Sequence, residues 1–119
     1  MKPGDRILIC GGRDYEDAEA FEAIMGAFLG KHQWFEAVIE GGALGADRMA
    51  RDWAMRHGIC TITVLANWNK WGNSAGPIRN RQMLEKCNPD VVIAFPGGRG
   101  TKNMVEQAKH KGVEVIEIT

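Results

Sequence analysis

Short apolar runs alternate with stretches of helical periodicity along most of this chain. The apolar runs predict five strands: Ile7–Cys10, Ala37–Ile39, Cys60–Ala66, Val91–Phe95 and Val113–Ile118. Between the first two runs, apolar residues recur at the i, i+3, i+4 and i+7 spacing of an amphipathic helix, and a second such stripe contains Trp53. Further helices are expected at about 78–87 and 100–111. The pattern predicts a single α/β domain spanning residues 1–119.

The polar residues within the strands suggest their order in the sheet. Strict β/α alternation with short connections predicts parallel strands, right-handed crossovers and a three-layer, Rossmann-like sandwich. Strand three contains Thr61 and Thr63, and strand five contains Glu114 and Glu117, whereas the other three strands are continuously apolar. Polar positions are typical of edge strands. We therefore expect a five-stranded parallel sheet of order 3-2-1-4-5; the alternative order 2-1-3-4-5 would place strand three inside.

Three glycine-rich loops follow strands one, two and four. In the expected order they border the point where the strand order reverses, which is where ligands bind in open α/β sheets. Helix N-termini carry unpaired N–H groups and partial positive charge, so such loops suit phosphate binding. The alternative is that the glycines only form tight turns. The familiar GxGxxG and GxxxxGK[ST] patterns are both absent.

The segment from Asn67 to Arg81 is expected to begin with a long loop and contains no acidic residue. Trp68 offers a face on which a base could stack, and Arg79 offers a planar cation for phosphate. Trp71 is expected to pack the loop onto the domain, and Trp53 to lie in the core. The complete set of expected ligand-contacting residues is Gly11, Gly12, Arg13, Gly41, Gly42, Gly45, Trp68, Arg79, Asn80, Pro96, Gly97, Gly98, Arg99, Gly100 and Thr101.

Composition narrows the class of protein further. The formal net charge is zero, which argues against nucleic acid as a partner, and no apolar run is long enough to span a membrane. The three cysteines, Cys10, Cys60 and Cys87, lack CxxC spacing and are expected to be buried, reduced thiols of a cytoplasmic protein. No metal site and no cofactor are predicted.

The motifs GGR, EGGALGAD, GPIRNRQM and PGGRGT, in this order along the chain, resemble those of the SLOG superfamily. This superfamily includes the lonely-guy phosphoribohydrolases, which release the base from cytokinin nucleoside monophosphates and carry PGGxGTxxE and MxxRKxxM motifs. Pro96, Gly97, Gly98, Gly100 and Thr101 match the first motif, and Arg79 and Met83 match the second. The resemblance also implies a homodimer or higher homo-oligomer.

Three positions depart from the hydrolase motifs. Met104 stands in place of the glutamate, Gly76 in place of the first methionine, and Asn80 in place of the lysine. Cleavage of a glycosidic bond usually needs a carboxylate. The remaining candidates for catalysis are Glu40, Asp47 and Arg79, although Glu40 could instead hold loop amides and Asp47 could cap its helix.

These observations favour a module that binds a nucleotide or a nucleotide-derived ligand, such as an ADP-ribose-like molecule, in order to sense or sequester it. The first alternative is a phosphoribohydrolase that uses a relocated acid. The second alternative is nucleic-acid binding, because a DNA-processing protein of bacterial transformation belongs to the same superfamily.

Overall fold

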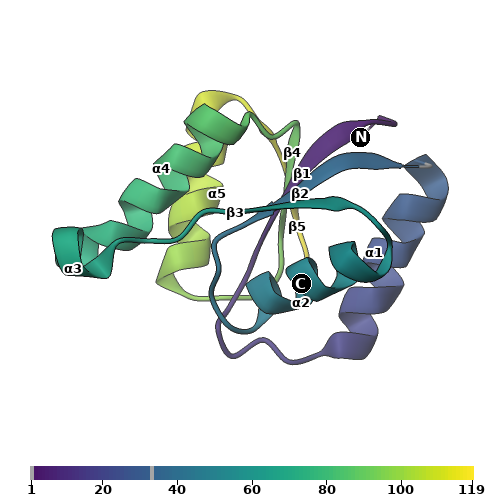
Figure 1. The fold of residues 1–119 in the computed structure, drawn as a ribbon, viewed down its shortest axis with the longest axis horizontal. Coiled ribbons are helices and arrows are strands. Elements are labelled where there is room, and N and C mark those ends of the chain that lie inside the picture. Colours follow the sequence, from purple (N-terminus) through teal and green to yellow (C-terminus); the bar gives the residue numbers. More distant parts are fainter. Residues whose placement is uncertain (1, 33) are drawn as a thin grey trace.

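The computed structural model describes residues 2–32 and 34–119 and forms a three-layer α/β sandwich (Figure 1). Its elements are β1 (Asp5–Cys10), α1 (Ala18–His32), β2 (Phe35–Glu40), α2 (Ala46–Arg56), β3 (Cys60–Thr63), α3 (Trp68–Trp71), the 3-10 turn η1 (Gly72–Ser74), α4 (Ala75–Cys87), β4 (Val91–Ala94), α5 (Arg99–Lys111) and β5 (Glu114–Glu117). All strand pairs are parallel and the strand order is β3-β2-β1-β4-β5, which confirms the predicted order.

Alternating side chains of the central strands build two hydrophobic cores, one on each face of the sheet. Ile7 and Ile9 of β1 face α1 and α2, where they pack with Phe21 and Trp53. Leu8 faces α4 and α5, whose core residues include Met83, Leu84 and Met104. Burial of strand residues on both faces explains the continuous apolar runs Ile7–Cys10 in β1, Ala37–Ile39 in β2 and Val91–Ala94 in β4. Trp53 is fully buried, as predicted.

The switch point lies between β1 and β4. From β1 the chain proceeds to β2 and β3 on one side of the sheet, and it then continues with β4 and β5 on the other side. Their register pairs Cys10 with Ala94, so both strands end at the same level of the sheet. The backbone pairing continues one residue further, because the Phe95 amide donates a 2.8 Å hydrogen bond to the Cys10 carbonyl. The loops after these strands therefore start side by side.

The segment after β3 differs from the prediction of a long loop. The Asn67 side chain accepts a hydrogen bond from the Lys70 amide and starts the short helix α3, which continues through η1 into α4. Helix α4 begins at Ala75 and not near residue 78. Pro77 is tolerated because it lies in the first turn, where its missing N–H is not needed.

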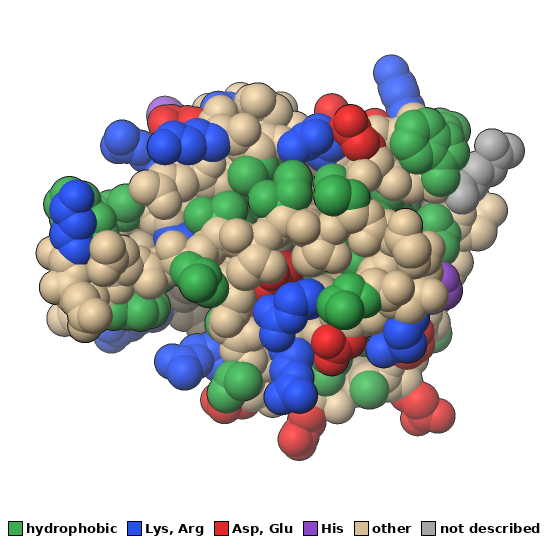
Figure 2. Space-filling model, in the orientation of Figure 1, with side chains coloured by type: hydrophobic (Ala, Val, Ile, Leu, Met, Phe, Trp, Pro, Cys, Tyr) green, Lys and Arg blue, Asp and Glu red, His purple; other side chains and the backbone are tan. Residues whose placement is uncertain are grey.

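Two predictions about side-chain burial are wrong. Trp71 remains 45% exposed at the end of α3, with the Lys70 ammonium 4.8 Å from its ring centroid, so it does not pack the segment onto the domain. Cys60 is exposed because it opens the edge strand β3, whereas Cys10 and Cys87 are buried and all three thiols are free. Hydrophobic side chains also gather near the middle of the face that β3 crosses (Figures 1 and 2).

Candidate functional site

A pocket of about 1080 Å³ opens at the carboxyl ends of the strands, beside the switch point. All expected ligand-contacting residues except Gly45 line it: Gly11, Gly12, Arg13, Gly41, Gly42, Trp68, Arg79, Asn80, Pro96, Gly97, Gly98, Arg99, Gly100 and Thr101. The fold therefore brings together loops after β1, β2 and β4 with side chains of α3 and α4. Within the described ranges, no group of three or more acidic, histidine or cysteine side chains is arranged to hold a metal ion.

Several loop glycines are required by close packing between the loops. A Cβ on Gly11 would lie 2.6 Å from the Ala46 Cβ, and one on Gly45 would lie 2.6 Å from the Arg13 carbonyl oxygen. Gly45 also has a φ of 69°, a conformation that glycine adopts without strain. It packs under the β1 loop and does not line the main pocket. For these residues, the turn-forming interpretation of the glycines is sufficient.

Gly98 and Gly100 differ, because a Cβ on either would meet no atom within 4 Å and neither has a positive φ. They flank the start of α5, whose N-cap residue, Gly98, provides no side-chain cap. The helix has no acidic residue in its first turn, and three basic residues occupy its last turn. The partial positive charge at the α5 N-terminus therefore has no negative side chain of its own turn to balance it.

The amides of α5 are available to a ligand. Within the described part of the chain, Arg99, Gly100 and Thr101 donate no backbone hydrogen bond, and the first amide of this helix that does is that of Lys102, to the Gly98 carbonyl. The N-terminus of α2 is different: the Ala46 amide donates to the Gly12 carbonyl, and Asp47 provides an acid in the first turn. Of these two helix starts, that of α5 is the better suited to an anion.

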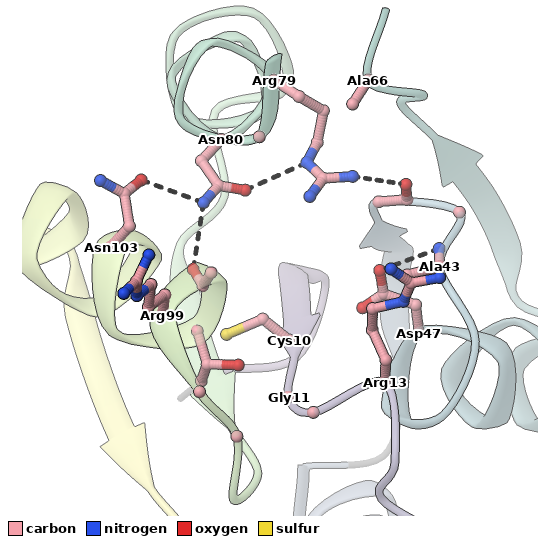
Figure 3. A pocket seen from close by; sticks show the side chains of 18 of the residues that line it. Cys10, Gly11, Arg13, Ala43, Asp47, Ala66, Arg79, Asn80, Arg99 and Asn103 are labelled. Carbon is pink, nitrogen blue, oxygen red and sulfur yellow. Dashed lines mark hydrogen bonds between the residues drawn. The ribbon is translucent and has the colours of Figure 1, made fainter. Parts of the chain in front are cut away.

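Arg79 projects from α4 into the pocket and is held by two hydrogen bonds (Figure 3). Its Nη1 donates to the Gly41 carbonyl at 2.6 Å, and its Nε donates to the Asn80 Oδ1 at 3.1 Å. Figure 3 shows the third guanidinium nitrogen directed into the cavity. The arginine is therefore fixed in place while one N–H₂ group stays available.

Asn80 has its polar atoms engaged within the protein. It is 3% exposed, and its Nδ2 donates to the Gly100 carbonyl and to the Asn103 Oδ1, at 3.2 and 3.1 Å. Gln107 donates a further 2.7 Å bond to the same Asn103 oxygen. Although Asn80 lines the pocket, this geometry makes it a residue that positions Arg79 and joins α4 to the start of α5.

The two acidic candidates for catalysis, Glu40 and Asp47, differ in whether they line the pocket. Glu40 is fully buried and does not line the pocket; it accepts hydrogen bonds from the Gly42 amide, from Arg51 and from the Thr63 hydroxyl. It holds the β2 loop, as the structural alternative proposed. Asp47 is 6% exposed and lines the pocket, but it does not cap α2; its Oδ2 accepts a 3.2 Å bond from the Ala43 amide.

Burial raises the pKa values of three groups that line the pocket, Cys10, Tyr15 and Asp47. Desolvation raises the pKa of Asp47, and the nearby Glu40 charge adds to this, while the Ala43 amide and Arg79 oppose it. Desolvation, together with the charge of Asp47, raises the pKa of Cys10 to about 12, so the thiol in the pocket floor is protonated at neutral pH.

Sequence reasoning missed an apolar rim formed by Leu44 and Leu65, which line the pocket beside Trp68. These three side chains are 57%, 70% and 57% exposed. Large apolar side chains left exposed around a pocket mark a surface that a ligand can cover. Leu44 follows Ala43 in EGGALGAD, and neither Leu44 nor Leu65 differs in its sequence context from a core residue.

The parallel sheet, the switch-point pocket and the uncapped helix start define a Rossmann-like α/β protein with a site suited to a phosphate-bearing ligand. Residues 5–71 match the model of the YspA, cpYpsA-related SLOG family, so the chain belongs to this family. It is also 35% identical to the Gene 61 protein of Mycobacterium phage D29 over 118 residues, covering 93% of this chain and 94% of that protein. Family membership indicates binding or processing of a nucleotide-related ligand.

Proposed function

We propose that this protein binds a nucleotide or nucleotide-derived ligand, with its phosphate at the N-terminus of α5. The observation that carries this proposal is the set of free amides at 99–101, which opens into a pocket that also receives Arg79. Arg13 and Arg99 line the same pocket, are exposed and form no ion pair within the described residues. Free amides, helix dipole and guanidinium groups together favour phosphate.

The apolar rim supports a second part of the proposal, that the base of the nucleotide binds at Leu44, Leu65 and Trp68, away from the phosphate. Leu44, Leu65 and Trp68 provide apolar surface and one aromatic face, and no charged side chain is needed to bind a base there. The volume of about 1080 Å³ lies slightly above the range of roughly 300–1,000 Å³ typical of small-molecule sites. A ligand of the size of ADP-ribose is therefore as compatible as a mononucleotide.

Binding without turnover is favoured by the environment of Met104. This residue stands where the lonely-guy hydrolases carry glutamate, and it is fully buried among core residues of α5 and the sheet. Asn103 lines the pocket instead. We infer that the protein senses or sequesters its ligand.

Hydrolysis of an N-glycosidic bond is the second candidate, and Asp47 is the observation that favours it. A carboxyl group of raised pKa that lines a pocket is a suitable general acid. Incubation with AMP and ADP-ribose, followed by chromatography for released adenine and the matching ribose phosphate, separates the two candidates. Binding without any released base supports the first, and catalytic release of base that is lost in Asp47→Asn supports the second.

Isothermal titration with AMP, ADP-ribose, NAD and cyclic nucleotides tests the binding proposal. We expect saturable binding of at least one of these compounds, and competition by inorganic phosphate at millimolar concentration. Competition by phosphate would show that the site recognises the phosphate group of the ligand. Absence of binding by all of the compounds would overturn the proposal.

A further inference from the structure

Asp47 is a buried carboxylate in a pocket otherwise suited to anions. The acidic residues that line the pocket within the described ranges are Asp14, which is exposed, and Asp47, which is 6% exposed. Figure 3 shows Asp47 and Arg99 on opposite sides of the cavity, with Cys10 between them. A buried carboxylate repels phosphate, so a different part of the ligand must face it.

The protein supplies few hydrogen-bond donors to this carboxylate. Its Oδ2 accepts from the Ala43 amide, and the Gly41 amide is a second backbone donor close to the carboxylate. No ion pair with Arg79 lies within 4.0 Å among the described residues, and that guanidinium donates to Gly41 and Asn80. A carboxylate offers about four acceptor sites, so about half of its capacity is left for a ligand. A buried charge with unused acceptors is costly, and a ligand that brings donors removes this cost.

We propose that Asp47 recognises the hydroxyl groups of a ribose ring, which makes the pocket selective for ribonucleotides over 2′-deoxyribonucleotides. This inference rests on the proposed function. A ribose lies between the phosphate and the base of a nucleotide. Figure 3 shows Asp47 across the cavity from Arg99 at the start of α5, and Leu44 of the apolar rim lines the same pocket. Vicinal hydroxyls are neutral double donors, which suits a carboxylate that phosphate avoids.

An amino group on the base is the other donor that a nucleotide could present to Asp47. The ribose is favoured because Asp47 is buried in the pocket, whereas the rim suited to a base is exposed. A site that hydrogen-bonds a hydroxyl rejects an analogue that lacks it, since the buried polar group is then left unpaired. The comparison of AMP with 2′-deoxy-AMP tests the ribose, and the comparison of AMP with IMP tests the amino group.

The experiment measures these affinities by calorimetry for wild type, Asp47→Asn and Asp52→Asn. If AMP does not bind, the ribo, 2′-deoxy and hypoxanthine forms of ADP-ribose replace the three probes. We expect wild type to bind the 2′-deoxy form about 10- to 100-fold more weakly than the ribo form, and the hypoxanthine form equally well. Asp47→Asn should weaken ribo binding by a similar factor and leave 2′-deoxy binding unchanged. Asp52, exposed on the same helix and paired with Arg48, is the matched control and should preserve the discrimination.

The outcomes separate this inference from the proposed function. Equal binding of ribo and 2′-deoxy forms by wild type would overturn the inference while the binding proposal stands, as would an Asp47→Asn variant that loses affinity for both forms equally. Selectivity against the hypoxanthine form would assign Asp47 to the base and overturn the ribose assignment. No binding of any probe by folded wild type would overturn both.

Discussion

The guanidinium of Arg79 lies directly on the bare backbone of Gly41, 38 positions earlier in the chain. Its Nη1 donates to the Gly41 carbonyl at 2.6 Å, and a Cβ on Gly41 would stand only 2.8 Å from the Arg79 Cζ. The glycine thus makes room for the arginine and also fixes its orientation. This contact joins α4 to the β2 loop across the pocket.

Replacement of Arg79 by alanine should weaken nucleotide binding by at least about 100-fold, because it removes a cation whose remaining N–H₂ group faces the cavity. Loss of the bond to Gly41 should lower the free energy of unfolding by only about 1 kcal/mol. Arg81→Ala is the control, since Arg81 is exposed on α4 and paired with Glu85. Titration calorimetry and urea unfolding check both effects; equal affinities of the two variants would contradict a role for Arg79 in binding.

Gly98→Asp should abolish binding and leave the fold intact. Aspartate at the N-cap of α5 has open space for its side chain and is a favourable capping residue, so the melting temperature should be unchanged or slightly higher. Its charge would occupy the place proposed for phosphate. Gly98→Asn provides the same cap without the charge and should bind more tightly than Gly98→Asp. Retention of wild-type affinity by the aspartate variant would exclude α5 as the phosphate site.

Asp47→Asn should stabilise the ligand-free protein at neutral pH. Burial raises the pKa of Asp47 in the folded state, so the folded chain holds this proton more tightly than the unfolded chain. The contribution of Asp47 to the free energy of unfolding is therefore most favourable below the unfolded value of about 4 and declines as pH rises through the folded-state pKa. Asparagine removes this decline and can still accept the Ala43 N–H bond.

Thermal unfolding of wild type and Asp47→Asn between pH 4 and pH 7 measures this effect. The gain in melting temperature should be larger at pH 7 than at pH 4, and Asp52→Asn should show no such trend because Asp52 is exposed. A lower melting temperature for Asp47→Asn at pH 7 would show that the charge stabilises the fold. Higher stability combined with weaker ribonucleotide binding is the behaviour expected of a functional side chain.

Glu40→Ala should destabilise the protein by about 3–5 kcal/mol, because it leaves the Gly42 amide, the Thr63 hydroxyl and Arg51 without their buried acceptor. Glu36→Ala, in which an exposed carboxylate of the same strand is removed, is the control and should cost less than about 1 kcal/mol. Chemical unfolding measures both. A small loss in Glu40→Ala would mean that the β2 loop keeps its conformation without this carboxylate.

Met104→Glu should not create a phosphoribohydrolase. The side chain at 104 points into the core formed with Leu8 and Met83, so glutamate there would cost about 3 kcal/mol or more and would not enter the pocket. Met104→Leu, which keeps the core apolar, should cost less than about 1.5 kcal/mol. Release of adenine from AMP by a folded Met104→Glu variant, detected by chromatography, would contradict this account.

The fold was predictable because the residue composition of each strand reflects its position in the sheet. Thr61 and Glu114 marked β3 and β5 as edges, and the structure has them there. Helix α3 was not predictable, because four residues contain no periodicity and the cap from Asn67 depends on local geometry. The burial of Trp71 was wrongly expected for the same reason: the side chain of a short helix at one end of the molecule has little to pack against (Figure 1).

The membership of the pocket was also largely predictable, because glycine loops after parallel strands must meet at one edge of the sheet. The division of roles among the acids was not. Glu40 and Asp47 looked equivalent in sequence, and only the fold brings Thr63 and Arg51 to Glu40 while leaving Asp47 in the pocket. Leu44 and Leu65 could not be told from core residues until their exposure was known.

The hydrogen bonds between the glycine loops have one more consequence. The Gly12 amide donates to Pro96 and the Gly12 carbonyl accepts from Ala46, so the loops after β1, β2 and β4 form one connected frame. Trp68 stands outside this frame, on the short helix α3, and it contributes one of the apolar side chains of the pocket. In the proposed binding mode this frame holds the phosphate and Trp68 contacts the base, so a substitution at Trp68 is expected to change base preference more than phosphate binding.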